Sequence, residues 1–191
     1  AVIRAKEPLV VCGVELVAPV YALIDPAVTV KEACTDGTRL TAGRLVATVS
    51  GPIRAILTGE RTVLNLLQRL SGVATLTRRY VEALDPRSKT QIADTRKTTP
   101  GWRTMEKYAV EVGGGVNHRF GLDDGILIKD NHIAAAGSIR AAVRRARAAA
   151  HHLLKIEVEV STLTEVREAL AAEADIIMLD NMDVATMKKA I

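Results

Sequence analysis

The sequence predicts an α/β protein in which a small N-terminal α/β sandwich domain over residues 1–72 precedes part of a parallel α/β barrel over residues 73–191. Three observations predict this class. Short runs rich in Val, Thr and Gly fill the first 58 residues, an apolar repeat of helical spacing follows, and strand patterns then alternate with helix patterns. Such alternation is typical of βαβ units around a parallel sheet.

The first domain is predicted from its apolar runs and turn signals. Residues 9–11 and 45–49 form strands, and residues 19–26 hold a short helix or an irregular connection. The dipeptides Asp36-Gly37, Ala42-Gly43 and Gly51-Pro52 mark the turns.

A long helix is predicted from Glu60 onward, because apolar residues recur there at helical spacing. We expect it to bend near Gly72, to lead into the second domain and to stop at Asp85-Pro86. Beyond it the predicted strands are 90–96, 125–129, 155–160 and 175–179, and the predicted helices are 103–112, 138–152 and one that follows Thr162 with a capping box to Glu165.

Each predicted strand of the second domain ends in charged or amide residues, which is typical of chemistry at the carboxyl ends of TIM-like barrel strands. A complete barrel needs about 250 residues, so residues 73–191 amount to an incomplete TIM-like barrel. We therefore expect the chain to be truncated at both ends, since it also begins without Met.

Composition excludes several classes of function. A net charge of +4 and five aromatic residues do not favour nucleic-acid binding. The two cysteines lie outside any metal-ligand spacing, and we expect both to be reduced. No apolar run is long enough to span a membrane, and no signal peptide is recognisable, so we expect a cytoplasmic protein.

The densest group of polar residues lies between positions 94 and 132. It consists of Asp94-Thr95-Arg96-Lys97-Thr98-Thr99-Pro100-Gly101, Gly113-Gly114-Gly115-Val116-Asn117-His118-Arg119 and Lys129-Asp130-Asn131-His132. With Glu60-Arg61-Thr62-Val63-Leu64-Asn65 and Leu67-Gln68-Arg69-Leu70-Ser71-Gly72, these stretches resemble the quinolinate phosphoribosyltransferase family over essentially the whole chain.

The resemblance implies a decarboxylating transferase of NAD biosynthesis. Its members convert quinolinate and phosphoribosyl pyrophosphate into nicotinate mononucleotide, pyrophosphate and carbon dioxide, with Mg²⁺ as cofactor. It also implies a homodimer or a higher homo-oligomer, in which Arg61 reaches the active site of the partner subunit. As structure alone, Arg61 is a solvated helix residue paired with Glu60.

The nature of the substrates supports the same reading, because a dicarboxylate and a pyrophosphate both need fixed cations. The resemblance places Arg96, Arg119 and Lys129 at the quinolinate carboxylates, with His118 beside them. Thr95 and Lys97 belong to the same cluster, and Lys97 is our candidate catalytic residue near the reacting centre. The alternative for these residues is that they are surface charges on loops.

Two carboxylates complete the predicted site. Glu157 and Glu159 share one face of their strand, and Asp180 ends the next one. By register with the family, Glu159 and Asp180 are the catalytic carboxylates for ribose hydroxyls, Mg²⁺ and the positive charge of the transition state, with Glu157 in support. The metal contact of Glu159 and Asp180 could be indirect.

Other functions stay open at this point. A paralogous phosphoribosyltransferase could act on another substrate, although Asn117-His118-Arg119 favours quinolinate. A barrel lyase could use Lys97 or Lys129 as a Schiff base, and an inactive interaction fragment is a third possibility. The Gly-rich strand ends that hold the 5′-phosphate in the family have no counterpart before Ile191.

Overall fold

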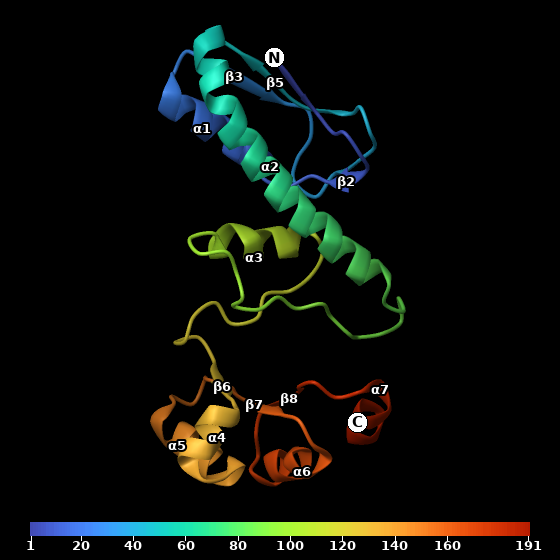
Figure 1. The fold of residues 1–191 in the computed structure, drawn as a ribbon, viewed down its shortest axis with the longest axis vertical. Coiled ribbons are helices and arrows are strands. Elements are labelled where there is room, and N and C mark those ends of the chain that lie inside the picture. Colours follow the sequence, from blue (N-terminus) through green and yellow to red (C-terminus); the bar gives the residue numbers. More distant parts are fainter. The chain divides into compact units, whose positions relative to one another are not determined.

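The computed structural model describes all residues from 1 to 191, and these form two compact units, Ala1–His118 and Arg119–Ile191. Both units combine helices with strands, so the predicted mixed α/β class is confirmed. Figure 1 shows the order of the elements along each unit. No helix combines the length and the hydrophobicity that crossing a membrane requires.

The first unit begins with small antiparallel sheets. Strands β1 (Val2–Arg4), β5 (Leu45–Ser50) and β3 (Thr29–Glu32) pair in that order, and β2 (Leu9–Val10) pairs with β4 (Arg39–Leu40). The strands predicted at 9–11 and 45–49 are present within one residue. Both strands contain β-branched residues, and glycines at positive φ supply the neighbouring turns.

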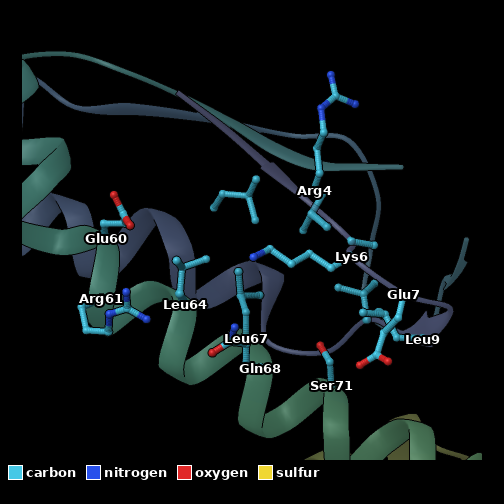
Figure 2. Close-up of a pocket in the computed structure, with 14 residues that line it drawn as sticks. Arg4, Lys6, Glu7, Leu9, Glu60, Arg61, Leu64, Leu67, Gln68 and Ser71 are labelled. Carbon is cyan, nitrogen blue, oxygen red and sulfur yellow. The ribbon is translucent and has the colours of Figure 1, made fainter. Parts of the chain in front are cut away.

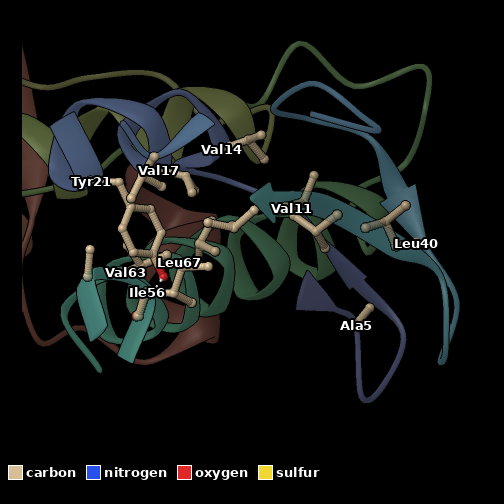
Figure 3. Packing of buried hydrophobic residues seen from close by; sticks show 13 residues of the cluster. Ala5, Val11, Val14, Val17, Tyr21, Leu40, Ile56, Val63 and Leu67 are labelled. Atoms are coloured by element: carbon tan, nitrogen blue, oxygen red, sulfur yellow. Dashed lines mark hydrogen bonds between the residues drawn. The ribbon is translucent and has the colours of Figure 1, made fainter. Parts of the chain in front are cut away.

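Two helices cover this sheet. A 3₁₀ turn, η1 (Val14–Leu16), leads into α1 (Val17–Ile24), and α2 (Ile53–Glu82) follows β5. Strands and helices share one buried cluster, in which the Tyr21 hydroxyl donates to the carbonyl of Ile56 at 3.3 Å (Figure 3). A Cβ at position 59 would lie 2.6 Å from Tyr21 Cε1, so Gly59 is what allows α1 and α2 to pack this closely.

The start of the long helix was predicted too late. The helix begins at Ile53 rather than at Glu60, because the buried residues Ala55, Ile56 and Gly59 already lie at the helical spacing that leads to Val63. It runs without a break through Gly72 to Glu82, close to the predicted stop.

Helix α3 (Arg103–Val112) matches its prediction and packs against α2 through a small core that includes Leu70, Ala74 and Ala109. The strand predicted at 90–96 is wrong. It is reduced to one parallel bridge between Ala93 and Val116, because only that short stretch offers it a partner and the chain turns directly afterwards.

The second unit contains the predicted alternation. Strands β6 (Ile126–Ile128), β7 (Ile156–Val160) and β8 (Ile176–Leu179) form an open parallel sheet in that order. Helices α5 (Ile139–Ala149), α6 (Leu163–Ala171) and α7 (Val184–Ala190) follow them, and the capping box between Thr162 and Glu165 is present.

One helix of this unit was not predicted. Helix α4 (Asp130–Ala136) begins directly after β6, where the sequence indicated only a polar strand end. The His132 side chain accepts a hydrogen bond from the backbone N–H of Lys129 at 3.0 Å, which caps the first turn, and Gly137 ends the helix at a positive φ.

Candidate functional site

In the first unit, the segment 94–99 carries three of the predicted substrate-binding residues. Thr95 and Lys97 are exposed, and Arg96 between them is half-buried. The backbone N–H of Lys97 donates to Thr95 Oγ1 at 3.0 Å and that of Thr98 to the carbonyl of Arg96 at 2.9 Å, so the chain turns sharply here. Arg96 Nε is buried without a hydrogen-bond partner.

His118 lies against the same segment. Its backbone N–H donates to Asp94 Oδ1 at 2.8 Å, and its neighbour Val116 forms the bridge to Ala93. The structure therefore brings His118 together with the segment that carries Thr95, Arg96 and Lys97. This adjacency follows from pairing between residues more than twenty positions apart, which the sequence pattern did not indicate.

The predicted residue Arg61 lies elsewhere in this unit. It is exposed on α2 and lines a pocket of about 420 Å³ between α2 and the N-terminal strands, with Lys6, Leu64 and Gln68 (Figure 2). Figure 2 shows the Lys6 side chain extending toward Leu64 while the Arg4 guanidinium points away; Arg4 donates to the carbonyl of Gly43 at 3.0 Å. No hydrogen bond or ion pair of the structure joins Arg61 to segment 94–99.

In the second unit, three of the predicted residues lie at or near the carboxyl ends of parallel strands. Lys129 follows β6, Glu159 lies in β7 and Asp180 follows β8. Lys129 Nζ lies 3.0 Å from Glu159 Oε2, which pairs two of the predicted side chains directly.

Glu159 and Asp180 line the same hollow of about 120 Å³ with Asp130 and Glu165. Hydrogen bonds from Ser161 and Thr162 hold the pKa of Glu165 below its usual value, which favours the ionised carboxylate. Glu157, predicted as a supporting residue, is buried in β7. The hollow is thus rich in carboxylates.

Arg119 opens the second unit in the loop before β6. Its Nη1 donates to the carbonyl of Gly125 at 3.0 Å, which holds the guanidinium group over its own loop. The remaining N–H groups of a guanidinium fork suit a carboxylate ligand.

The fit of this hollow to a metal ion depends on its donor set. No group of three or more His, Cys, Asp or Glu side chains is arranged to hold an ion. Mg²⁺, however, commonly uses one or two carboxylates and completes its shell with water and substrate phosphates. Glu159 and Asp180 fit such a shared site and do not form a complete protein cage.

Two family models together match almost the entire chain. The C-terminal domain of quinolinate phosphoribosyl transferase matches residues 73–191, and its N-terminal domain matches residues 1–71. This chain belongs to the quinolinate phosphoribosyltransferase family.

Curated relatives agree with this family. The chain is 52% identical over 188 residues to a probable nicotinate-nucleotide pyrophosphorylase (carboxylating) of Bacillus subtilis, covering 98% of this chain and 65% of that protein. The human nicotinate-nucleotide pyrophosphorylase (carboxylating) is 42% identical over 182 residues, covering 95% of this chain and 61% of that protein. The chain thus spans less than two thirds of the length of these relatives.

Solved structures of the family share the fold. NadC from Streptococcus pyogenes superposes with a TM-score of 0.92 at 50% identity, and the match covers all of this chain and 67% of that one. The nicotinate-nucleotide pyrophosphorylase of Francisella tularensis superposes with a TM-score of 0.94 at 41% identity over the same shares of the two chains.

Sequence reasoning missed the residues that surround segment 94–99 in this member of the quinolinate phosphoribosyltransferase family. Arg69 on α2 and Glu106 and Lys107 on α3 contact the segment, and the two α3 residues are buried. A signal was present, because charged residues at 103, 106 and 107 repeat at the spacing of one helix face. Charge at that spacing is more typical of a solvated face, whereas the structure buries Glu106 and Lys107.

Proposed function

We propose that this chain carries the catalytic and quinolinate-binding residues of an enzyme that transfers the phosphoribosyl group of phosphoribosyl pyrophosphate to quinolinate. Decarboxylation then gives nicotinate mononucleotide, pyrophosphate and carbon dioxide in NAD biosynthesis. In this member of the family, cationic side chains lie on loops and at a strand end, and carboxylates line a hollow at the ends of β7 and β8. This combination is the observation that carries the proposal.

The cations match the charge of quinolinate. Arg96 and Arg119 offer guanidinium forks that bind carboxylates in a bidentate manner, and Lys129 adds a point charge. The buried, unpartnered Nε of Arg96 supports this role, because a carboxylate oxygen would satisfy it. We assign Thr95 and His118 to the same substrate on the basis of their place beside Arg96.

The reaction requires positioning and charge neutralisation. The pyridine nitrogen of quinolinate attacks the anomeric carbon as the bond to pyrophosphate breaks, and Glu159 and Asp180 stabilise the positive charge on the ribosyl ring. The nitrogen is then cationic and stabilises the carbanion left on the neighbouring ring carbon when its carboxylate leaves as carbon dioxide, and a proton from water completes the product. Lys97 is proposed to lie near the reacting atoms, where its ammonium group is a positive charge in addition to that of the ring nitrogen.

Mg²⁺ is the proposed cofactor, held by Glu159, Asp180 and substrate oxygens. When bound, the ion neutralises the departing pyrophosphate.

The finer architecture is also proposed. The chain would divide into a small α/β sandwich over 1–72 and an incomplete TIM-like barrel over 73–191, with the open sheet β6-β7-β8 as part of the barrel wall. Arg61 would serve the active site of the partner subunit in a homodimer. The free Cys12 and Cys34 support a reducing, cytoplasmic location.

The structure favours this function over a Schiff-base lyase. A lysine that forms a Schiff base is activated by desolvation or by a cationic neighbour. Lys97 is exposed, and Lys129 is half-exposed and paired with a carboxylate. Neither lysine has the environment that the alternative requires.

The proposal is tested by calorimetric titration of the chain with quinolinate in the absence of phosphoribosyl pyrophosphate. We expect saturable binding, and we expect Arg119→Ala to weaken it by about tenfold or more, because a charge-assisted hydrogen bond is lost. Arg140→Ala, on the exposed face of α5, is the matched control and should bind normally. A folded chain that binds nicotinate as well as quinolinate would favour a paralogous enzyme, and one that binds neither would refute the proposal.

A further inference from the structure

Helix α3 presents a charged face to the segment that carries Thr95, Arg96 and Lys97. Arg103, Glu106 and Lys107 stand at positions i, i+3 and i+4 of this helix, so they share one face. Glu106 and Lys107 are only 8% and 3% exposed. Buried charges of this kind are costly unless they are paired, so their partners indicate what they are for.

Lys107 holds the N-terminal end of the segment. Its Nζ donates to Asp94 Oδ1 at 2.5 Å and to the carbonyl of His118 at 2.9 Å. Asp94 Oδ1 also accepts the backbone N–H of His118 at 2.8 Å. The three residues close a ring of hydrogen bonds that fixes the His118 backbone through both its N–H and its carbonyl.

Glu106 holds the C-terminal end. Its carboxylate accepts the backbone N–H of Thr99 at 3.1 Å and the Thr99 hydroxyl at 2.8 Å. Arg69 of α2 donates to the same carboxylate from Nε at 2.9 Å and from Nη2 at 2.6 Å, and to Thr99 Oγ1 at 2.9 Å. Burial alone would raise the pKa of Glu106, but these bonds outweigh it and hold the pKa below its usual value.

Between these two attachments the segment forms a short turn, closed by the hydrogen bonds from Lys97 N–H to Thr95 Oγ1 and from Thr98 N–H to the carbonyl of Arg96. Its backbone pairing with the stretch around Val116 stops at the bridge of Ala93, and the side chains of Thr95 and Lys97 are exposed. Arg103 Nε donates to Thr98 Oγ1 at 3.2 Å, which adds a third contact from the same face of α3. Helix α3 therefore holds this turn at both ends, through Lys107 at Asp94 and through Arg103 and Glu106 at Thr98 and Thr99.

We infer that Glu106 and Lys107 are positioning residues: they hold the two ends of segment 94–99 and thereby fix Thr95, Arg96, Lys97 and His118 for the dicarboxylate substrate. The inference rests on the proposed function. Neither residue contacts the substrate. Lys107 acts through Asp94 and His118, and Glu106 acts through Thr99.

The test compares Glu106→Gln and Lys107→Met with two matched controls. Glu32→Gln and Lys31→Met make the same changes at adjacent exposed positions of β3. Quinolinate affinity is measured by calorimetry, and amide hydrogen exchange is measured by NMR. We expect each α3 variant to bind quinolinate about tenfold or more weakly, because a small displacement of a binding group has a large effect. Both controls should bind as the unmodified chain does.

Hydrogen exchange separates positioning from general destabilisation. Exchange should accelerate selectively at the His118 amide in Lys107→Met and at the Thr99 amide in Glu106→Gln, with the amides of β5 unchanged. If Lys107→Met does not fold, Asp94→Asn combined with Lys107→Met removes both charges and serves in its place.

Two results would overturn the inference. Either both folded variants bind quinolinate with unchanged affinity, or exchange rises uniformly over Ala1–His118 in step with the affinity loss. Absence of quinolinate binding by the unmodified chain would instead count against the proposed function, and the inference would then fall with it.

Discussion

Two lysine–carboxylate pairs, one in each unit, have similar geometry and opposite surroundings. Lys107 Nζ lies 2.5 Å from Asp94 Oδ1, and the two side chains are 3% and 7% exposed. Lys129 Nζ lies 3.0 Å from Glu159 Oε2, and those side chains are 42% and 17% exposed. The first pair is enclosed by protein, whereas the second is open to solvent at its lysine.

The difference in exposure determines whether the lysine of an ion pair can leave its carboxylate and bind a ligand. A buried pair cannot release its lysine without leaving an uncompensated carboxylate, so it is confined to building structure. A half-exposed pair has a small net stability, so an anionic ligand can take over its lysine at little cost. This contrast supports the proposed roles, in which Lys107 belongs to the framework of the candidate site and Lys129 binds the ligand.

The largest effect that this comparison predicts is on stability. Lys107→Met should lower the free energy of unfolding by about 3–5 kcal/mol, because Asp94 is left buried and unpaired. Urea denaturation followed by circular dichroism measures the change.

The double variant Asp94→Asn with Lys107→Met is the control, and it should recover much of the loss because no lone charge remains. A double variant as unstable as Lys107→Met would show that packing, and not the unpaired charge, causes the loss. The comparison between the two pairs would then have to be abandoned.

A smaller, pH-dependent effect is expected at Glu106, the other buried charge of the first unit. Its folded-state pKa is depressed, so its contribution is complete above the unfolded value of about 4.5 and is lost as the pH falls through the folded pKa. Glu106→Gln should therefore cost about 1–3 kcal/mol of unfolding free energy at pH 7.

Below pH 4.5 this difference between the chain and Glu106→Gln should shrink, and urea denaturation across that range measures it. Glu32→Gln should show no comparable pH-dependent difference, because that side chain is exposed. A stability difference between the chain and Glu106→Gln that is independent of pH would mean that the shape of the Glu106 side chain, and not its charge, stabilises the fold.

The fold could be predicted where local pattern decides it. The extents of α3 and β7 agree with the predicted ones within one residue. The strand at 90–96 could not be judged in this way. Whether an apolar run becomes a strand depends on a partner, and here the only partner is a single residue more than twenty positions away.

The candidate site was predictable in part for a similar reason. Lys129, Glu159 and Asp180 each stand at or near the end of their own strand, so the strand ends indicate the stretches that contain them, and the resemblance to the family selects these three. Glu106 and Lys107 are indistinguishable from solvated helix residues until their partners Thr99 and Asp94 are placed. Buried charged residues that hold the binding residues in place, without contacting the ligand themselves, are found only from the tertiary structure.

The smallest stability effect should belong to Lys129. Replacing it with Met should change the free energy of unfolding by at most about 1 kcal/mol, because the pair it forms with Glu159 is exposed at the lysine.

The effect of the same substitution on quinolinate binding should be large. If Lys129 binds a carboxylate of quinolinate, Lys129→Met should weaken that binding by about tenfold or more in calorimetry, since a charge-assisted contact is lost. Lys155→Met, which changes an exposed lysine just before β7, should leave affinity and stability alike unchanged. A Lys129→Met variant that is destabilised as strongly as Lys107→Met but still binds quinolinate would contradict the role proposed for Lys129. Exposure would then not distinguish a lysine that stabilises the fold from a lysine that binds the ligand.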